Sequence, residues 1–160
     1  MGNPQTLIGP ELKKGDSAPD FKVIDEKMQP VDLAKTGHEV RIFSVVPSLD
    51  TPVCDAQTKK FNEDIGGMHG VEVYTISMDL PFAQKRWCSA YGVDKVKMLS
   101  DHREGSFGAA YGVLIKDARL LARALFVVDK HNKIQHAEYV SEVANHPDYM
   151  AAMNAAASLA

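Results

Sequence analysis

Residues 40–55 read VRIFSVVPSLDTPVCD, an apolar run that ends at a proline and leads into a helix start. The run 40–46 is rich in β-branched residues, as is typical of a central strand that is covered on both faces. Thr51 is a favoured N-cap residue and Pro52 is favoured at the first helical position, so a helix is predicted over residues 52–65. Functional sites in α/β proteins often lie on such a link between a strand and a helix.

Strands and helices alternate along the rest of the chain. Hydrophobic patterns and turn residues predict an N-terminal β-hairpin, further strands, two more long helices and a short one. Their predicted bounds are 21–25 and 31–33 for the hairpin, 71–77, 96–99, 121–128 and 134–140 for the strands, and 81–91, 106–111 and 147–159 for the helices. This order predicts an α/β fold, in which helices flank both sides of a mixed central β-sheet within a single domain spanning residues 1–160.

The composition excludes several classes of function. The chain has 160 residues, 45% of them hydrophobic, and a formal net charge of −3. A self-sufficient core is therefore expected, and nucleic acid is not an expected partner. No stretch approaches the ~18 consecutive apolar residues that a membrane span requires. The N-terminus lacks a basic segment followed by an apolar core, so a cytoplasmic protein without a signal peptide is expected.

Cys54 falls in the first turn of the predicted helix. Unpaired backbone N–H groups and the positive end of the helix dipole favour the thiolate there, which is the reactive form of cysteine. Asp55 opposes this by like-charge repulsion, so a nearby cation is expected. The best candidate is Arg123, inside the apolar strand 121–128, although an arginine that reaches solvent at the wet end of the strand is an equal alternative. The Thr51 hydroxyl lies on the same turn and can bind a group held at the sulfur.

Cys88 lies near the end of the predicted helix 81–91, where the helix dipole disfavours a thiolate. Cys54 and Cys88 are far apart in sequence, so they form neither the CxxC pair of a thioredoxin-type enzyme nor the paired ligands of a zinc site. The presence of two cysteines alone leaves three interpretations open: two buried thiols, a structural disulfide or a redox pair. The asymmetry of the two positions is the pattern expected of an attacking cysteine and a resolving one, which form a disulfide through a sulfenic acid.

The six histidines are scattered, mostly in predicted turns, and the HExxH motif does not occur. We therefore expect solvated histidines, no metal site and no cofactor. Besides a reaction in which Cys54 attacks and Cys88 resolves, two other functions could use the same cysteines. One is a thiol–disulfide oxidoreductase, which would need the missing CxxC. The other is a non-enzymatic redox sensor or peroxide-modulated binding protein, which would form the disulfide slowly and without turnover.

Pro47, Thr51 and Cys54 fit the peroxiredoxin pattern Pro-x-x-x-Thr/Ser-x-x-Cys. Four longer strings closely resemble, in the same order, the bacterial thiol peroxidase subfamily of atypical two-cysteine peroxiredoxins: SVVPSLDTPVCD, TISMDLPFAQKRWC, SFGAAYGVLI and LLARALFVVD. The resemblance covers about residues 12–152, nearly the whole chain. It implies a thioredoxin-like fold with an N-terminal hairpin.

The resemblance also implies roles for individual residues. It assigns the peroxidatic cysteine to Cys54, the resolving cysteine to Cys88, the pair that activates Cys54 to Thr51 and Arg123, and the shield of the pocket to Pro47. The implied activity is reduction of hydrogen peroxide and organic hydroperoxides, lipid hydroperoxides included, in antioxidant defence and redox homeostasis. The implied partners are the hydroperoxide substrate, thioredoxin as reductant and a second copy in a homodimer. Oxidation is expected to loosen both cysteine helices so that an intramolecular Cys54–Cys88 disulfide can form.

Overall fold

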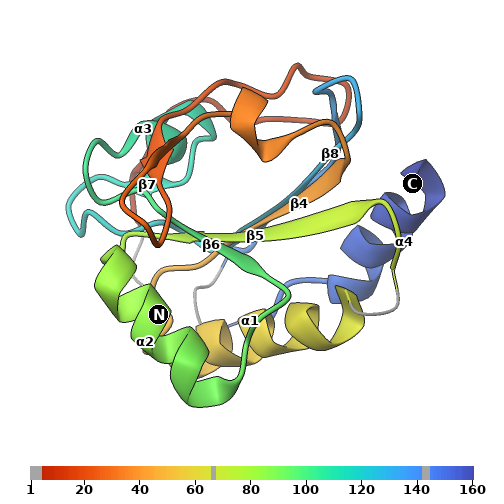
Figure 1. The fold of residues 1–160 in the computed structure, drawn as a ribbon. Coiled ribbons are helices and arrows are strands. Elements are labelled where there is room, and N and C mark those ends of the chain that lie inside the picture. The colour runs from red at the N-terminus through yellow and green to blue at the C-terminus, as the bar shows by residue number, and fades with distance from the viewer. Residues whose placement is uncertain (1–4, 66–67, 142–144) are drawn as a thin grey trace.

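The computed structural model describes residues 5–65, 68–141 and 145–160 (Figure 1). In chain order its elements are β1 (Leu7–Ile8), β2 (Val23–Ile24), β3 (Pro30–Val31), the 3-10 helix η1 (Ala34–Thr36), β4 (Val40–Val45), α1 (Pro52–Ile65), β5 (Val71–Ser77), α2 (Pro81–Tyr91), β6 (Lys97–Ser100), α3 (Ser106–Ala110), β7 (Leu114–Ile115), β8 (Ala124–Val128), β9 (Ile134–Tyr139) and α4 (Tyr149–Leu159). Within the described residues, seven strands form one sheet in the order β3-β2-β6-β5-β4-β8-β9, and β1 pairs separately with β7.

Strand β4 lies in the interior of the sheet, with strands on both sides, and all of its residues are buried, as predicted. It pairs in parallel with β5 on one side and antiparallel with β8 on the other, so that Val45 has Ile76 and Ala124 as its two partners. Strand β6 continues the parallel part beyond β5, whereas β9 extends the antiparallel part beyond β8. The predicted mixed sheet is therefore confirmed, and its central strand ends directly before the loop that leads to Cys54.

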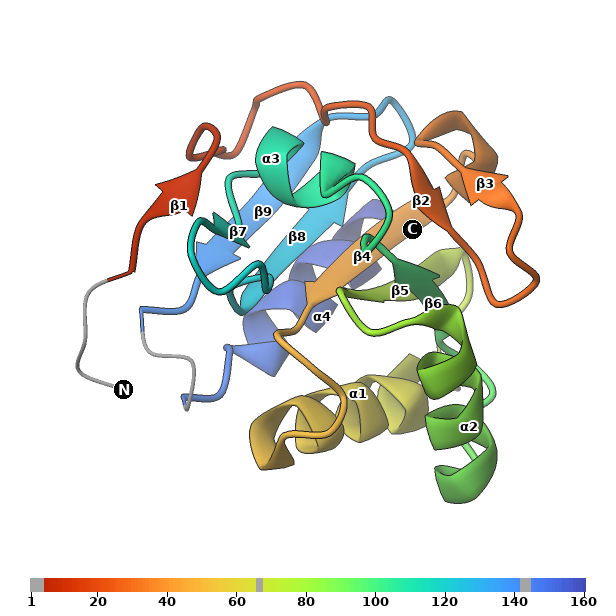
Figure 2. The same ribbon diagram turned by 90° about the vertical axis from the view of Figure 1, so that its left-hand side faces the viewer.

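The sheet separates two hydrophobic layers (Figure 2). Helices α1, α2 and α4 cover one face, where Phe61 and Trp87 pack in the same cluster as apolar side chains of β4, β5 and β8. Helix α3 and the N-terminal segment cover the other face, where the stacked rings of Phe107 and Tyr111 have centroids 4.1 Å apart. Helices thus flank both faces, as predicted, and Cys54 belongs to the first layer.

The predicted N-terminal hairpin is present as β2 and β3, which pair antiparallel with Val23 opposite Val31. Strand β2 also pairs with β6, so the hairpin forms one edge of the main sheet. The predicted bounds 21–25 and 31–33 leave Pro30 in the turn between the two strands, but Pro30 lies in β3, because a proline without an N–H is tolerated on an edge strand. The turn is closed instead by Asp25, whose Oδ1 accepts hydrogen bonds from two backbone N–H groups.

The pairing of β1 with β7 is absent from the sequence prediction. The segment after β1 lies so close to the end of α3 that both sides require glycine. A Cβ on Gly9 would lie 1.9 Å from Ala109 O, and a Cβ on Gly112 would lie 1.9 Å from Pro10 O. These short strands depend on a contact between distant parts of the chain, which hydrophobic periodicity does not reveal.

Strand β8 and helix α4 are among the elements that begin later than predicted. Strand β8 begins at Ala124 and not at residue 121, because Ala122 N donates a hydrogen bond of 2.7 Å to a carbonyl just before β7. Helix α4 begins at Tyr149, because the Asp148 carboxylate accepts a hydrogen bond from a backbone N–H of the first turn and caps the helix. Arg123 consequently lies directly before β8 and not within it.

Candidate active site

Cys54 lies in the first turn of α1, and its side chain is completely buried. Thr51 O accepts a hydrogen bond of 2.9 Å from Asp55 N, which places Thr51 at the predicted N-cap position. Pro47 follows β4 and is buried as well. The loop over residues 47–51 therefore holds Cys54 between the end of the central strand and the positive end of a helix dipole.

The cation predicted for Cys54 is in place. Arg123 Nη2 donates a hydrogen bond of 3.2 Å to Cys54 Sγ. Because Ala124 pairs with Val45, the two strand ends bring the guanidinium beside the start of α1. The Arg123 side chain is only 2% exposed, so the alternative in which it reaches solvent is wrong. Sulfur and guanidinium are thus in hydrogen-bond contact inside the protein core.

A buried amide orients the guanidinium, and the sequence analysis did not single it out. Gln57 Oε1 accepts a hydrogen bond of 2.7 Å from Arg123 Nη1, and Gln57 Nε2 donates one of 2.7 Å to Ser44 Oγ. Both Gln57 and Ser44 are fully buried. A signal was available, since Gln57 lies three residues after Cys54 on the same side of the helix, and Ser44 interrupts an apolar strand. Polar residues at buried positions need partners.

The Thr51 hydroxyl donates a hydrogen bond of 2.9 Å to Ser48 O, within the loop before α1. Thr51 itself is exposed, whereas Cys54 on the same turn is buried. The hydroxyl has a single proton, which this bond uses, and its lone pairs are acceptor sites for a donor such as the O–H of a hydroperoxide. The predicted role of Thr51 toward a bound substrate is compatible with this geometry.

Cys88 lies in the last turn of α2 and is half-buried, and both Cys54 and Cys88 are free thiols. Burial raises the pKa of the Cys88 thiol to about 11, and the negative charge of Glu26 adds to the effect. The side chain lines a groove of about 750 Å³ between α2, the start of β6 and the turn of the hairpin. A disfavoured Cys88 thiolate agrees with the sequence analysis, although burial and not the helix dipole is the main cause.

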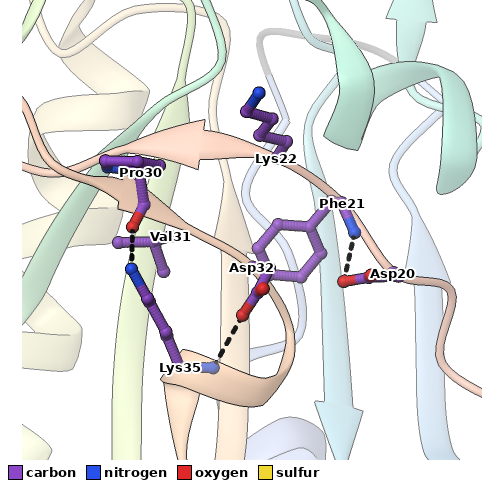
Figure 3. A pocket seen from close by; sticks show the side chains of 7 residues that line it. All are labelled: Asp20, Phe21, Lys22, Pro30, Val31, Asp32 and Lys35. Carbon is purple, nitrogen blue, oxygen red and sulfur yellow. Dashed lines mark hydrogen bonds between the residues drawn. The ribbon is translucent and has the colours of Figure 1, made fainter.

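A smaller pocket lies between β2, β3 and η1, and neither cysteine lines it (Figure 3). Its volume is about 210 Å³. Its polar groups bond one another or nearby backbone: Lys35 Nζ donates to Pro30 O at 2.9 Å, and Asp20 Oδ1 accepts from the N–H groups of Phe21 and Leu33. We therefore assign this pocket to the packing of the hairpin.

Metal ligands do not gather in residues 5–65, 68–141 and 145–160, where no group of three or more His, Cys, Asp or Glu side chains could hold an ion. The expectation of solvated histidines is wrong for His102 and His136, which are half-buried with Nε2 enclosed and unpartnered. It holds for His38, His69, His131 and His146. None of the helices in the described ranges is long and apolar enough to span a bilayer.

A buried cysteine that is held at a helix start against an arginine, on a mixed sheet of this topology, defines a thioredoxin-like thiol redox protein. The Redoxin family model matches residues 13–153. Thiol peroxidases from Halalkalibacterium halodurans and Bacillus subtilis are 57% and 56% identical over 155 and 158 residues, which cover 97% and 99% of this chain and 93% and 95% of theirs. The chain belongs to the thiol peroxidase family of peroxiredoxins.

Solved structures agree with this assignment. A crystal structure of a peroxiredoxin-like protein from Aquifex aeolicus matches with a TM-score of 0.92 and 44% identity, over 99% of this chain and 94% of its own. The family resemblance, the thioredoxin-like fold and the class of enzyme, an oxidoreductase acting on peroxide, are therefore confirmed.

Proposed function

We propose that this chain reduces hydrogen peroxide and organic hydroperoxides, lipid hydroperoxides included, with Cys54 as the attacking thiol, and so serves antioxidant defence and cell redox homeostasis. The observation that carries the proposal is the 3.2 Å hydrogen bond from Arg123 Nη2 to Cys54 Sγ. A guanidinium at that distance stabilises negative charge on the sulfur and on the oxygen that leaves when the O–O bond of a peroxide breaks. The Gln57 amide keeps the guanidinium in this orientation.

In the first step, the Cys54 thiolate attacks the terminal oxygen of the hydroperoxide. An S–O bond forms while the O–O bond breaks, so the sulfur is oxidised to a sulfenic acid and the remaining oxygen leaves with the electron pair. That oxygen takes up a proton and departs as an alcohol, or as water from hydrogen peroxide. Arg123 stabilises the leaving charge, Thr51 binds the peroxide O–H, and Pro47 shields the pocket from water.

In the second step, Cys88 resolves the sulfenic acid. The Cys88 sulfur displaces the hydroxyl group from Cys54 Sγ, so a disulfide forms and one water leaves. Cys54 is fully buried on α1 and Cys88 is half-buried on α2, and we expect both helices to loosen before the sulfurs meet. Thioredoxin then supplies two thiols, leaves with its own disulfide and returns both cysteines to the reduced form.

Apolar side chains near the Cys54 loop support a wide range of hydroperoxides. Leu49 and Val53 flank Thr51 in the chain, while Leu80 and Phe82, at the start of α2, are 49% and 71% exposed. Exposed apolar side chains of this size also support the homodimer that the family suggests. Sedimentation velocity of the reduced, single-domain chain tests the assembly, and a monomer at all concentrations would exclude the dimer.

Stopped-flow mixing of the reduced protein with one equivalent of hydrogen peroxide tests the chemistry. Trp87 precedes Cys88, is 5% exposed and packs on Tyr91, so its fluorescence reports movement of α2. Peptide mass mapping should show an intramolecular Cys54–Cys88 disulfide, none in Cys54→Ser, and a trapped sulfenic acid in Cys88→Ser. Oxidation no faster than that of a free thiol would overturn the proposal.

Two further assays separate this enzyme from its rivals. Sustained consumption of hydroperoxide with thioredoxin, its reductase and NADPH is expected, and a single slow oxidation without turnover would identify a peroxide sensor. Reduction of insulin disulfides without peroxide consumption would identify a thiol–disulfide oxidoreductase.

A further inference from the structure

Asp79 lies in the loop between β5 and α2 and bonds to a second loop, the one between β4 and α1. Its Oδ1 accepts a hydrogen bond of 2.8 Å from Ser48 Oγ, and its Oδ2 accepts one of 2.9 Å from Leu49 N. Oδ2 also accepts a bond of 2.8 Å from Ser77 Oγ, at the end of β5. The hydroxyl of Ser100, at the end of β6, donates to Asp79 O. One residue therefore ties together the loops beyond the carboxyl ends of three strands.

The hydrogen bonds continue from Asp79 in both directions. The serine hydroxyl at the end of β5 accepts a bond of 3.2 Å from Gln84 Nε2, and Gln84 lies in α2 one turn before Cys88. On the other side, Ser48 O accepts a bond of 2.9 Å from the hydroxyl of Thr51, the residue at the N-cap of α1. A continuous chain of hydrogen bonds thus links the first turn of α1 to the face of α2 that carries the second cysteine.

We propose that Asp79 is a positioning residue that locks the Cys54 loop and the Cys88 helix into one unit, and that release of this lock sets the rate at which oxidised Cys54 meets Cys88. The inference rests on the proposed function, because it requires the sulfenic acid and disulfide steps. The first turn of α1 cannot leave its place while Ser48 and Leu49 stay bonded to Asp79. Once these bonds break, the loop before α2 loses the same anchor, so the two cysteine segments loosen together.

A carboxylate suits this role because its two oxygens accept bonds from three donors at once and carry the charge that strengthens them. Asp129, in the hairpin between β8 and β9, is a matched example elsewhere in the molecule. Its carboxylate accepts hydrogen bonds of 2.8–2.9 Å from His131 N, Lys133 N and Gln135 Nε2. All of these donors belong to its own hairpin, so Asp129 supplies a control that has comparable bonds and no link to either cysteine.

The test compares Asp79→Asn and Asp129→Asn with the wild type when the reduced full chain is mixed rapidly with excess hydrogen peroxide. Trp87 fluorescence and mass spectrometry give the rate constants for sulfenic acid and for disulfide formation, and the share of Cys54 overoxidised to sulfinic acid. We expect Asp79→Asn to raise the ratio of the second rate constant to the first by about tenfold, the factor for loss of one charge-assisted hydrogen bond. The sulfinic share should fall, and Asp129→Asn should match the wild type in both quantities.

The results distinguish a lock between the two cysteine segments from a general contribution of Asp79 to stability. If Asp79→Asn only lowers the melting temperature and leaves the ratio unchanged, the inference is overturned and the proposed function stands. If the wild type forms no disulfide, both fail. If Asp79→Asn does not fold, Ser48→Ala removes one arm of the same chain, and a folded Ser48→Ala with an unchanged ratio also overturns the inference.

Discussion

Gln57 Oε1 lies 2.7 Å from Arg123 Nη1, and this hydrogen bond connects the Cys54 helix to the residue directly before β8. Gln57 Nε2 donates to Ser44 Oγ on β4, so the amide is itself held by the central strand. The planar guanidinium is thereby turned so that Nη2 donates to Cys54 Sγ. Gln57 thus determines how the guanidinium that we propose to be catalytic faces the sulfur.

Replacing Gln57 by Met keeps the side-chain volume and removes the amide. We expect the second-order rate constant with hydrogen peroxide to fall roughly 10- to 100-fold, because a small misplacement of a catalytic group is costly. The free energy of unfolding should fall by about 1–3 kcal/mol, because buried polar groups lose this partner. Thr58→Ala is the control, since Thr58 is buried on the same helix and bonds only to Cys54 O among the described contacts. Equal rate constants in the two variants would contradict an orienting role.

Replacing Arg123 by Lys keeps the positive charge, but one ammonium cannot reproduce the two nitrogens that bond Cys54 Sγ and Gln57 Oε1. We expect the rate constant with hydrogen peroxide to fall about 100-fold, the typical cost of a lost donor to a developing oxyanion, and to fall further in Arg123→Met. Competition with a second peroxidase for hydrogen peroxide measures this rate constant. The exposed Arg119→Lys should retain wild-type activity. Full activity in Arg123→Lys would show that charge alone suffices.

Cys88 should react slowly with alkylating reagents at neutral pH. Burial, with a contribution from Glu26, raises its pKa from 9.0 to about 11, so iodoacetamide labelling of Cys54→Ser should increase until about pH 11. Because folding favours the protonated thiol, the stability that Cys88 contributes is present below pH 9 and is lost as the pH rises through 11. In urea, which unfolds the chain, the pH midpoint of Cys88 labelling should return toward 9. A midpoint below 9 in the folded protein would be incompatible with this burial.

Asp101 should make stability depend on pH in the acid range. Its side chain is buried, and burial raises its pKa from 3.8 to about 6, although the N–H groups of Gly108 and Phe107 donate to it and act in the opposite direction. The protonated acid therefore stabilises the fold, and its contribution, about 3 kcal/mol, is present below pH 3.8 and is lost as the pH rises through 6. Urea titrations of the wild type and Asp101→Asn at several pH values measure it, and a constant difference between them would refute it.

Local signals sufficed for residues whose roles depend on their neighbours in the chain. The pair Thr51 and Pro52 marks the helix start, which places Cys54 in the first turn, and the apolar run 40–46 is central in the sheet, as predicted. Arg123 differs, because apolar residues flank it on both sides in the chain. The alternation of polar and apolar residues therefore cannot decide whether its side chain points into the core or into solvent. The register of β8 against β4 decides it.

Residues whose roles depend on distant partners could not be found in this way. Gln57, Ser44 and Asp79 are ordinary polar residues of a helix, a strand and a loop, and each gains its role from a contact across the fold. Gln57 bonds Ser44 across 13 positions and Arg123 across 66, and Asp79 bonds Ser48 across 31. Such contacts follow from the packing of whole elements, which periodicity in a single sequence does not specify.

Pro30 bears on how neighbouring molecules meet in a crowded solution. The N–H and C=O groups of an edge strand that point away from the sheet are the groups to which a foreign strand can attach. Pro30 has no N–H, and Lys35 Nζ occupies its carbonyl oxygen at 2.9 Å (Figure 3). An unfolded chain that approaches at this residue finds no donor and an acceptor already in use, so attachment of a foreign strand is disfavoured at this point of the hairpin edge.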